Sequence, residues 1–286
     1  MISASDLSSW DFCPRKVYFR RVLGIEPVKK EVMIKGIIKH KIFKEMINSY
    51  KETRNLEIEN IIEDTLSRYI KDFEVFDTDL AKFRQELNSS FSILGEKINK
   101  NEFFVPEFCE EWFESRDLEL KARVDVIFNE SGDWIIGDLK TDTSDFLGTK
   151  LQIGAGALLF EKHMNAKVNK IKIISHNDWT EKEINLTDEL RSQIFEKRDE
   201  IKTMLKNKNL PPLCLNPNKC SKCEFWESHC NVEKKAETEK ESEWVWECEY
   251  CGKTFETKKE CDKHEECCTK RKSLNKRASF WNRIFR

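Results

Sequence analysis

The eleven cysteines of this 286-residue chain are placed unevenly, and their spacing predicts small metal-bound elements near its C-terminal end. Cys13 and Cys109 stand alone, whereas two groups each contain a C-x-x-C pair. The groups are Cys214, Cys220, Cys223 and Cys230, and Cys248, Cys251, Cys261, Cys267 and Cys268. Residues 1–25 lack the apolar stretch of an export signal, so we expect a cytoplasmic protein, or a nuclear one in a eukaryote, with reduced thiols. Such thiol pairs indicate a metal centre in each group.

Hydrophobic periodicity predicts helices in the first hundred residues. Ser3 or Ser5 is placed to cap a first helix, and Pro14 should break it because proline lacks a backbone N–H donor. Apolar residues then recur at three- and four-residue spacing in three further segments, 33–50, 56–76 and 80–98. These segments should form an N-terminal helical layer.

The pattern changes to strands in the middle of the chain. Short segments with strand character are 103–113, 118–128, 134–139, 168–175 and 182–186. The mostly apolar segment 151–164 predicts a helix buried against the sheet, and Thr187 should cap a long helix that ends near Lys206. Strands interleaved with helices in this way predict a mixed α/β core.

Charged residues are distributed unevenly along the chain. The net charge is −2, yet residues 269–286 hold seven Lys or Arg and no acidic residue, so the rest of the chain is acidic. Residues 231–243 are charged and nearly free of apolar side chains, which is typical of a solvated linker. No apolar run reaches the roughly 18 residues that a membrane span needs. A nucleic-acid partner therefore requires a local basic groove or the basic tail.

Two carboxylates and a lysine form the sharpest chemical pattern. Asp125 lies among apolar residues of one predicted strand, and Asp138 and Lys140 lie two apart on the next, so their side chains share a face. Burying these groups without partners would be costly. They suit a site where carboxylates hold Mg²⁺ or Mn²⁺ and the ammonium faces water or phosphate, although a solvent-facing hairpin would also explain the pattern.

Four ordered pieces of the chain resemble the RecB-like branch of the PD-(D/E)XK nucleases. Asp125 followed by Gly-Asp-Leu-Lys at 137–140 is similar to the family motif, and Gln152 stands where the branch has the glutamine of Q-x-x-x-Y. His40, four residues after Gly36, matches the histidine of the preceding helix. The segment 5–18 around Cys13 is similar to the opening of the iron–sulfur members, which are the CRISPR-associated exonucleases and the exonuclease V group.

The resemblance implies a restriction-endonuclease-like mixed sheet and a role for each matched residue. Asp125, Asp138, the Leu139 carbonyl and His40 would bind Mg²⁺ or Mn²⁺, and Lys140 would orient and help deprotonate the attacking water. Glu107 or Glu110 is a candidate further acidic group. This chain departs from the family pattern in two places: Gly156 replaces the tyrosine of Q-x-x-x-Y, and Asp138 replaces the more common glutamate.

The first cysteine group would be completed by a distant thiolate. Cys220, Cys223 and Cys230 leave a four-coordinate site one ligand short, and Cys13 is the candidate fourth. Spacing alone suits Zn²⁺ or an iron–sulfur cluster, and His229 and the spare Cys214 keep a zinc site open. The resemblance favours a [4Fe–4S] cluster on Cys13, Cys220, Cys223 and Cys230.

The second cysteine group has the spacing of a zinc finger whose last histidine is replaced by cysteine. Its expected ligands are Cys248, Cys251, His264 and Cys268, with Cys267 as a substitute for Cys268. A small ββα finger is expected, which contacts either protein or DNA. The basic tail is suited to nucleic acid, an anionic membrane or a partner groove, or is disordered.

These predictions combine into one description of the chain. We expect a nuclease domain with a cluster at 1–230, a linker at 231–243, a zinc finger at 244–268 and a basic tail at 269–286. The expected activity is that of a metal-dependent DNA exonuclease on single-stranded DNA or DNA ends, in DNA repair or CRISPR adaptation. A weakly catalytic or non-catalytic DNA-end binding subunit and a zinc-dependent regulator are the alternatives.

Overall fold

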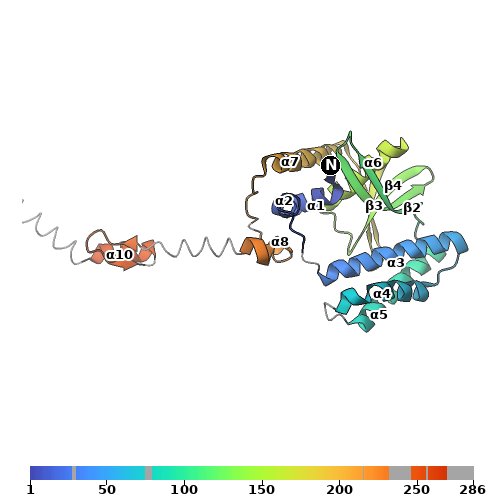
Figure 1. Ribbon diagram of the computed structural model, residues 1–286, viewed down its shortest axis with the longest axis horizontal. Helices are drawn as coiled ribbons and strands as arrows, with labels where there is room; N and C mark the ends of the chain where they lie inside the picture. The colour runs from blue at the N-terminus through green and yellow to red at the C-terminus, as the bar shows by residue number, and fades with distance from the viewer. Residues whose placement is uncertain (28–29, 75–78, 215, 232–245, 256, 269–286) are drawn as a thin grey trace, which may run out of the picture. The chain divides into compact units, whose positions relative to one another are not determined.

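The computed structural model describes residues 1–27, 30–74, 79–214, 216–231, 246–255 and 257–268. The chain divides into two compact units, Met1–Glu224 and Phe225–Arg286 (Figure 1). The first unit contains a six-stranded sheet, and the second contains a two-stranded one. Residues 232–243 of the expected linker and all of the expected tail, 269–286, lie outside the described residues. No helix in the described part of the chain is long and apolar enough to cross a membrane.

The large sheet is mixed. Its strands are β1 (Ile2–Ser3), β2 (Phe108–Ser115), β3 (Leu120–Glu130), β4 (Asp133–Lys140), β5 (Val168–Ser175) and β6 (Glu181–Asn185). The order is β1-β3-β4-β5-β6, and β2 pairs with β3 as well. The β3–β4 and β5–β6 pairs are antiparallel, whereas β4 and β5 run parallel and are joined by a crossover helix. The mixed α/β fold is therefore confirmed.

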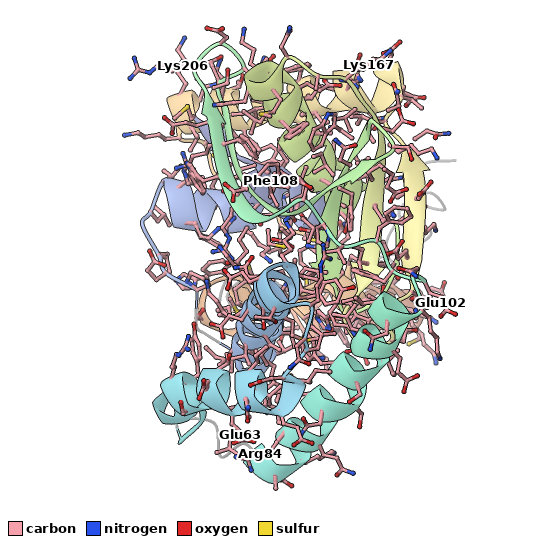
Figure 2. All side chains as sticks on the ribbon, turned by 90° about the vertical axis from the view of Figure 1, so that its right-hand side faces the viewer. Glu63, Arg84, Glu102, Phe108, Lys167 and Lys206 are labelled. Carbon is pink, nitrogen blue, oxygen red and sulfur yellow. The ribbon has the colours of Figure 1, made fainter. Side chains whose placement is uncertain are left out.

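Helices cover both faces of this sheet. The helices of the first unit are α1 (Ala4–Phe12), α2 (Pro14–Arg21), α3 (Glu31–Thr53), α4 (Ile58–Glu74), α5 (Leu80–Asn99), α6 (Leu147–Met164), α7 (Asp188–Asn207) and the short α8 (Pro217–Cys220), which is not part of the covering. One hydrophobic core joins one face to α6, α1 and α7, and a second joins the other face to α3, α4 and α5. Figure 2 shows α3, α4 and α5 grouped on one side of the strands. The predicted N-terminal helical layer is the second of these coverings.

The first two helices break where the sequence predicts. Ser3 caps α1 in a capping box with Asp6, and Pro14 is the first residue of α2, where its missing N–H costs nothing. Cys13 lies between them in an extended conformation, so its side chain leaves the helical path. The preceding strand β1 was not predicted, because two residues are too short for a periodic pattern.

Helix α6 approaches the sheet closely. A Cβ atom built on Gly156 would lie 2.9 Å from Val124 Cγ2 on β3 and 3.8 Å from Ile136 Cγ2 on β4. The chain therefore has no room for the tyrosine that the related motif places at this position. Strand β2 also begins later than predicted, at Phe108, because Pro106 has no N–H to give the ladder.

A tryptophan after β5 ties the helical layer to the sheet. Trp179 is 1% exposed and has a positive φ of 55°, which is rare for so bulky a residue. Its Nε1 donates to the Ser90 carbonyl of α5 at 2.8 Å, and its ring stacks on Phe43 of α3 at 5.4 Å between centroids. Ser90 Oγ in turn donates to the His176 carbonyl at 2.7 Å.

The second unit contains a ββα element, as predicted. A π-helical turn, η1 (Trp226–Cys230), opens the unit, and the hairpin β7 (Trp246–Glu247) and β8 (Thr254–Phe255) precedes α10 (Lys258–Cys267). Thr257 caps α10 by accepting from the Glu260 N–H. The hairpin turns through Gly252, whose φ of 72° favours glycine.

Candidate active site

The β3–β4 hairpin brings the two aspartates of the motif together. Val126 pairs with Gly137, so Asp125 and Asp138 lie opposite each other at the next position of the antiparallel register. Their side chains are 11% and 7% exposed. Gly137 is needed beside them, since an added Cβ would lie 2.6 Å from Val126 Cγ2. A pair of buried carboxylates thus occupies one end of the hairpin.

His40 reaches this pair from the helical layer. Its Nδ1 lies 3.5 Å from Asp125 Oδ2, and its Nε2 lies 3.2 Å from the Leu139 carbonyl oxygen. Asp125 Oδ2 also accepts the Leu139 N–H at 3.0 Å. The helix that carries His40 is therefore joined to both strands of the hairpin at the candidate site.

Lys140 and Gln152 surround the second aspartate. Lys140 Nζ lies 2.6 Å from Asp138 Oδ2, and the same ammonium donates to Gln152 Oε1 at 3.4 Å. Gln152 Nε2 donates to Asp138 Oδ1 at 3.3 Å. Gln152 thus aligns the lysine and the aspartate from α6, while Lys140 keeps 34% of its side chain exposed to solvent.

The two carboxyl groups have different proton affinities. Burial raises the pKa of Asp138 to about 7, with the charge of Asp125 adding to the rise and Lys140 opposing it. Burial also opposes ionisation of Asp125, but the hydrogen bond and charge of His40 outweigh it and lower that pKa to about 2. The pKa of His40 is raised, because the two aspartates outweigh its own burial. Asp125 is the anionic member, and Asp138 retains its proton more readily.

The donor set fits a hard divalent cation. Asp138 Oδ2 is fully buried and lies 2.6 Å from the Lys140 ammonium. Carboxylate and carbonyl oxygens such as those of Asp125, Asp138 and Leu139 are the ligands that Mg²⁺ and Mn²⁺ prefer. Metal–oxygen distances of roughly 2.1 Å place neighbouring octahedral ligands about 3 Å apart. The 3.2 Å between His40 Nε2 and the Leu139 oxygen matches that spacing.

The two other acidic candidates lie outside this donor set. Glu107 is exposed, and its backbone carbonyl accepts from Lys51. Glu110 is buried, but Lys41 binds one of its carboxylate oxygens at 3.0 Å and Arg123 binds the other at 3.1 Å. Neither side chain joins Asp125 and Asp138.

Sequence reasoning missed His176, which stands at the same edge of the sheet. Lys140 pairs with Ser175 in the parallel β4–β5 ladder, and the next residue, His176, donates its N–H to the Lys140 carbonyl at 2.8 Å. Burial, assisted by the charge of Lys39, lowers the pKa of His176 to about 4. Lys39 Nζ lies 3.3 Å from its Nδ1. The parallel crossover was the clue that could have placed His176 beside Lys140.

Four cysteine side chains of the first unit act on one another electrostatically. Burial raises the pKa of Cys13, and Cys214 and Cys223 raise it further. Burial also raises the pKa of Cys220, to about 11, with contributions from Cys214 and Cys13, and its thiol donates to the Cys214 carbonyl at 3.1 Å. Cys13 is thus close to a region of the sequence two hundred residues away. Cys230, the remaining candidate ligand, is a buried residue of the second unit.

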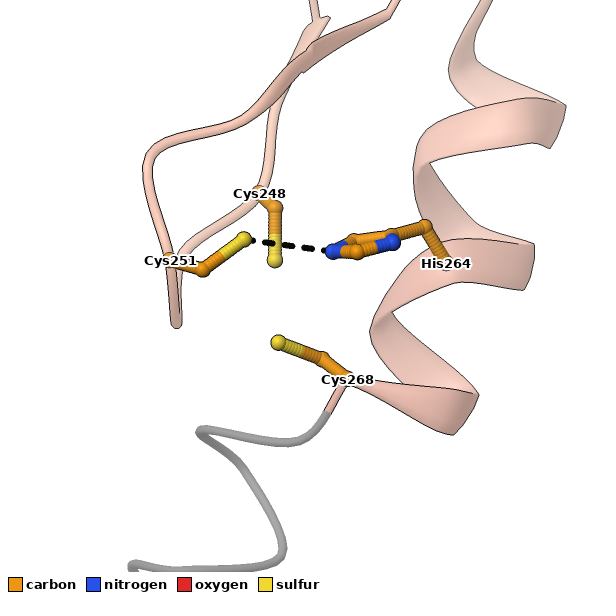
Figure 3. A group of neighbouring side chains, drawn as sticks. All are labelled: Cys248, Cys251, His264 and Cys268. Atoms are coloured by element: carbon orange, nitrogen blue, oxygen red, sulfur yellow. Dashed lines mark hydrogen bonds between the residues drawn. The ribbon is translucent and has the colours of Figure 1, made fainter.

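The finger residues converge on one point. The ligand atoms of Cys248, Cys251, His264 and Cys268 all lie within 4.8 Å of one another (Figure 3). Tetrahedral Zn–S bonds of about 2.3 Å require sulfur atoms roughly 3.8 Å apart, which this group can provide. Figure 3 shows Cys248 and Cys251 on the hairpin side and His264 and Cys268 on the side of α10.

The neighbouring cysteines have other positions. Cys267 is exposed and its thiol donates to the His264 carbonyl at 3.4 Å, so of the two adjacent candidates the structure places Cys268 in the group. Cys261 is 4% exposed and packs in the small core of the finger, as a small apolar residue would.

Comparisons with known proteins found relatives of low sequence identity. A curated relative, the CRISPR-associated exonuclease Cas4 of Francisella tularensis subsp. novicida (strain U112), is 24% identical over 226 residues, covering 79% of this chain and 91% of that protein. The CRISPR-associated exonuclease Cas4/endonuclease Cas1 fusion of Leptospira interrogans serogroup Icterohaemorrhagiae serovar Lai (strain 56601) is 28% identical over 139 residues, 46% of this chain and 26% of the fusion. A solved structure described as "Crystal structure of SSO0001" aligns with 18% identity and a TM-score of 0.32, over 76% of this chain and 94% of that one.

The family comparison covers the whole of the first unit. The model of the PD-(D/E)XK nuclease superfamily matches residues 1–231, a range that contains both aspartates, Lys140 and the helix with His40. By this match, the chain belongs to the PD-(D/E)XK nuclease superfamily.

Proposed function

We propose that the chain is a Mg²⁺- or Mn²⁺-dependent DNA exonuclease that acts on single-stranded DNA or DNA ends. The observation that carries this proposal is the convergence of the buried carboxylates of Asp125 and Asp138 with His40 and Lys140 at one end of the β3–β4 hairpin. The names of the two curated relatives support an exonuclease and a CRISPR-associated role, and we propose CRISPR adaptation as the pathway, with DNA repair as the alternative.

The proposed chemistry divides the work among six residues. Asp125, Asp138, His40 and the Leu139 carbonyl would hold the cation, which would supply Lewis acidity to the phosphodiester. Lys140, a partly exposed ammonium beside Asp138, would orient the attacking water and favour its ionisation through its positive charge, with the released proton passing to solvent. Gln152 fixes the directions of both Lys140 and Asp138 through its two hydrogen bonds.

We also propose two structural metal centres. Cys13, Cys220, Cys223 and Cys230 would bind a [4Fe–4S] cluster, supported by the electrostatic contacts among the thiols of the first unit. Cys248, Cys251, His264 and Cys268 would bind zinc, supported by their convergence. The corresponding division is a nuclease domain at 1–230, a linker at 231–243, a finger at 244–268 that contacts protein or DNA, and a basic tail at 269–286.

Cleavage assays on matched variants test the activity. Asp125→Asn and Lys140→Met in the full-length protein should abolish Mn²⁺-dependent release of nucleotides from end-labelled single-stranded DNA. Asp117→Asn is the control, because Asp117 is 74% exposed in the turn before β3 and pairs only with Lys162 among the described residues. Nuclease activity of both site variants near that of the control would contradict the assignment.

A further inference from the structure

Glu110 is an unusual residue for its position on β2. Its side chain is 6% exposed, and its backbone has a φ of 58°. The β2–β3 ladder keeps one register on either side of it, with Cys109 opposite Val126 and Glu111 opposite Val124, but Glu110 and Asp125 do not pair. Backbone strain of this kind persists where the surroundings hold it in place. Here the interruption falls opposite a candidate metal ligand.

The buried carboxylate of Glu110 gathers three cations. Lys41 Nζ lies 3.0 Å and Lys44 Nζ 3.8 Å from its Oε2, and Arg123 Nη2 donates to its Oε1 at 3.1 Å. Both oxygens are therefore occupied by cations. One negative charge against three positive ones leaves an excess of two positive charges at this place.

The three cations stand beside the candidate active site. Lys41 follows His40 directly on α3, and Lys44 lies one helical turn further along from His40. Arg123 is two residues before Asp125 on β3, so the two side chains leave the strand on the same face. Their side chains are 37%, 36% and 50% exposed, so each can meet solvent or a ligand while it remains anchored on Glu110.

We propose that Lys41, Lys44 and Arg123 form a binding site for backbone phosphates of single-stranded DNA, and that Glu110 is the positioning residue of this site. The proposal rests on the proposed nuclease function, because the phosphates would belong to the strand whose scissile bond lies at Asp125. A polyanion suits a fixed group of exposed cations, and arginine and lysine are the usual phosphate donors. Since the chain outside its tail is acidic overall, a polyanion needs a local positive excess of this kind to bind there.

Salt dependence of binding tests the phosphate site. Fluorescence anisotropy with a labelled single-stranded oligonucleotide in EDTA, at a series of KCl concentrations, measures affinity without cleavage. Each phosphate contact with a single strand contributes about 0.7 to the slope of log K against log salt. The triple variant Lys41→Gln, Lys44→Gln, Arg123→Gln should therefore lower the slope by about 2 and the affinity roughly 100-fold at 0.1 M salt.

A matched control removes the same charge elsewhere. Lys162, Lys167 and Lys206 are exposed or partly exposed residues at the end of α6, after α6 and in α7. Figure 2 shows Lys167 and Lys206 at the end of the first unit away from α3. Their triple replacement by Gln should leave the slope near that of the wild type. An equal fall in both triple variants, or no fall in the first, would overturn the phosphate site.

The direction of the change in DNA affinity on replacing Glu110 tests its positioning role. If Glu110 only reduced the local positive charge, Glu110→Gln would tighten DNA binding. As a positioning residue, its loss should instead weaken binding several-fold and lower the salt slope, and Glu110→Gln should add little to Arg123→Gln. Tighter binding by Glu110→Gln would refute the positioning role.

The outcomes separate this proposal from the proposed function. A wild-type protein that binds DNA through these cations but does not cleave it would contradict the nuclease assignment alone. A wild type that cleaves, with a triple variant whose binding is normal, would contradict the phosphate site alone.

Discussion

The close packing of α6 on the sheet makes a quantitative prediction for Gly156→Ala. A Cβ at this position would lie 2.9 Å from Val124 Cγ2, where ordinary contacts begin at 3.4 Å. Both Val124 and the nearby Ile136 are buried, so neither can turn into solvent. Overpacking of this size costs about 1–3 kcal/mol, whereas replacing a helical glycine by alanine gains about 1 kcal/mol. The net loss of unfolding free energy should be about 1 kcal/mol.

The control is another helical glycine. A Cβ on Gly36 of α3 would have no atom within 4 Å, so Gly36→Ala should gain the full propensity of about 1 kcal/mol. In a unit of this size, about 1 kcal/mol moves the melting temperature by roughly 2–4 °C, in opposite directions for the two variants. Thermal unfolding followed by circular dichroism measures both. A Gly156→Ala protein that melts above the wild type, as Gly36→Ala should, would refute the packing argument.

Three further predictions concern the candidate metal centres. Because burial raises the pKa of Asp138 to about 7, the wild type should lose stability as the pH rises through the range between the unfolded and folded pKa values. In EDTA, Asp138→Asn should therefore gain about 2–3 kcal/mol relative to the wild type between pH 5 and pH 8, and equal pH profiles in urea unfolding would contradict this. Cys13→Ser should lose the bound iron and visible absorbance of anaerobically purified protein, and Cys214→Ser should retain them; equal loss in both would mean that Cys214 is a ligand. Cys268→Ser should lose one zinc per chain by atomic spectroscopy, and Cys267→Ser should retain it. Loss of zinc from Cys267→Ser instead would mean that Cys267, and not Cys268, is the zinc ligand.

Local patterns were sufficient to predict most helices and strands. The strand Val168–Ser175 has the predicted bounds, and Thr187 caps α7 as expected, because alternation and capping are properties of a few neighbouring residues. The shared face of Asp138 and Lys140 follows from the strand period of two. The ββα finger follows from ligand spacing in the same way.

The remaining features depend on tertiary contacts. Strand β1 exists because Ile2 and Ser3 pair with Leu120 and Lys121, more than a hundred residues away. The carboxylate of Glu110 is directed at three cations by a left-handed backbone that no local pattern announced. The sequence showed only that Gly156 replaces the tyrosine of the family motif. The short distance from a Cβ at this position to Val124 explains why the residue is glycine.

The contacts of Trp179 give the molecule a built-in optical probe. Its indole is enclosed by Phe43, Phe91 and Phe103, and it bonds to Ser90 of α5. Indole emission shifts to longer wavelength when water reaches the ring. If α3 and α5 separate from the sheet before the sheet itself unfolds, the emission of Trp179 should redden while the circular dichroism of the strands persists. Because the chain has 8 Trp, the order in which the two layers are lost can be read from the difference in intrinsic fluorescence between the wild type and Trp179→Phe.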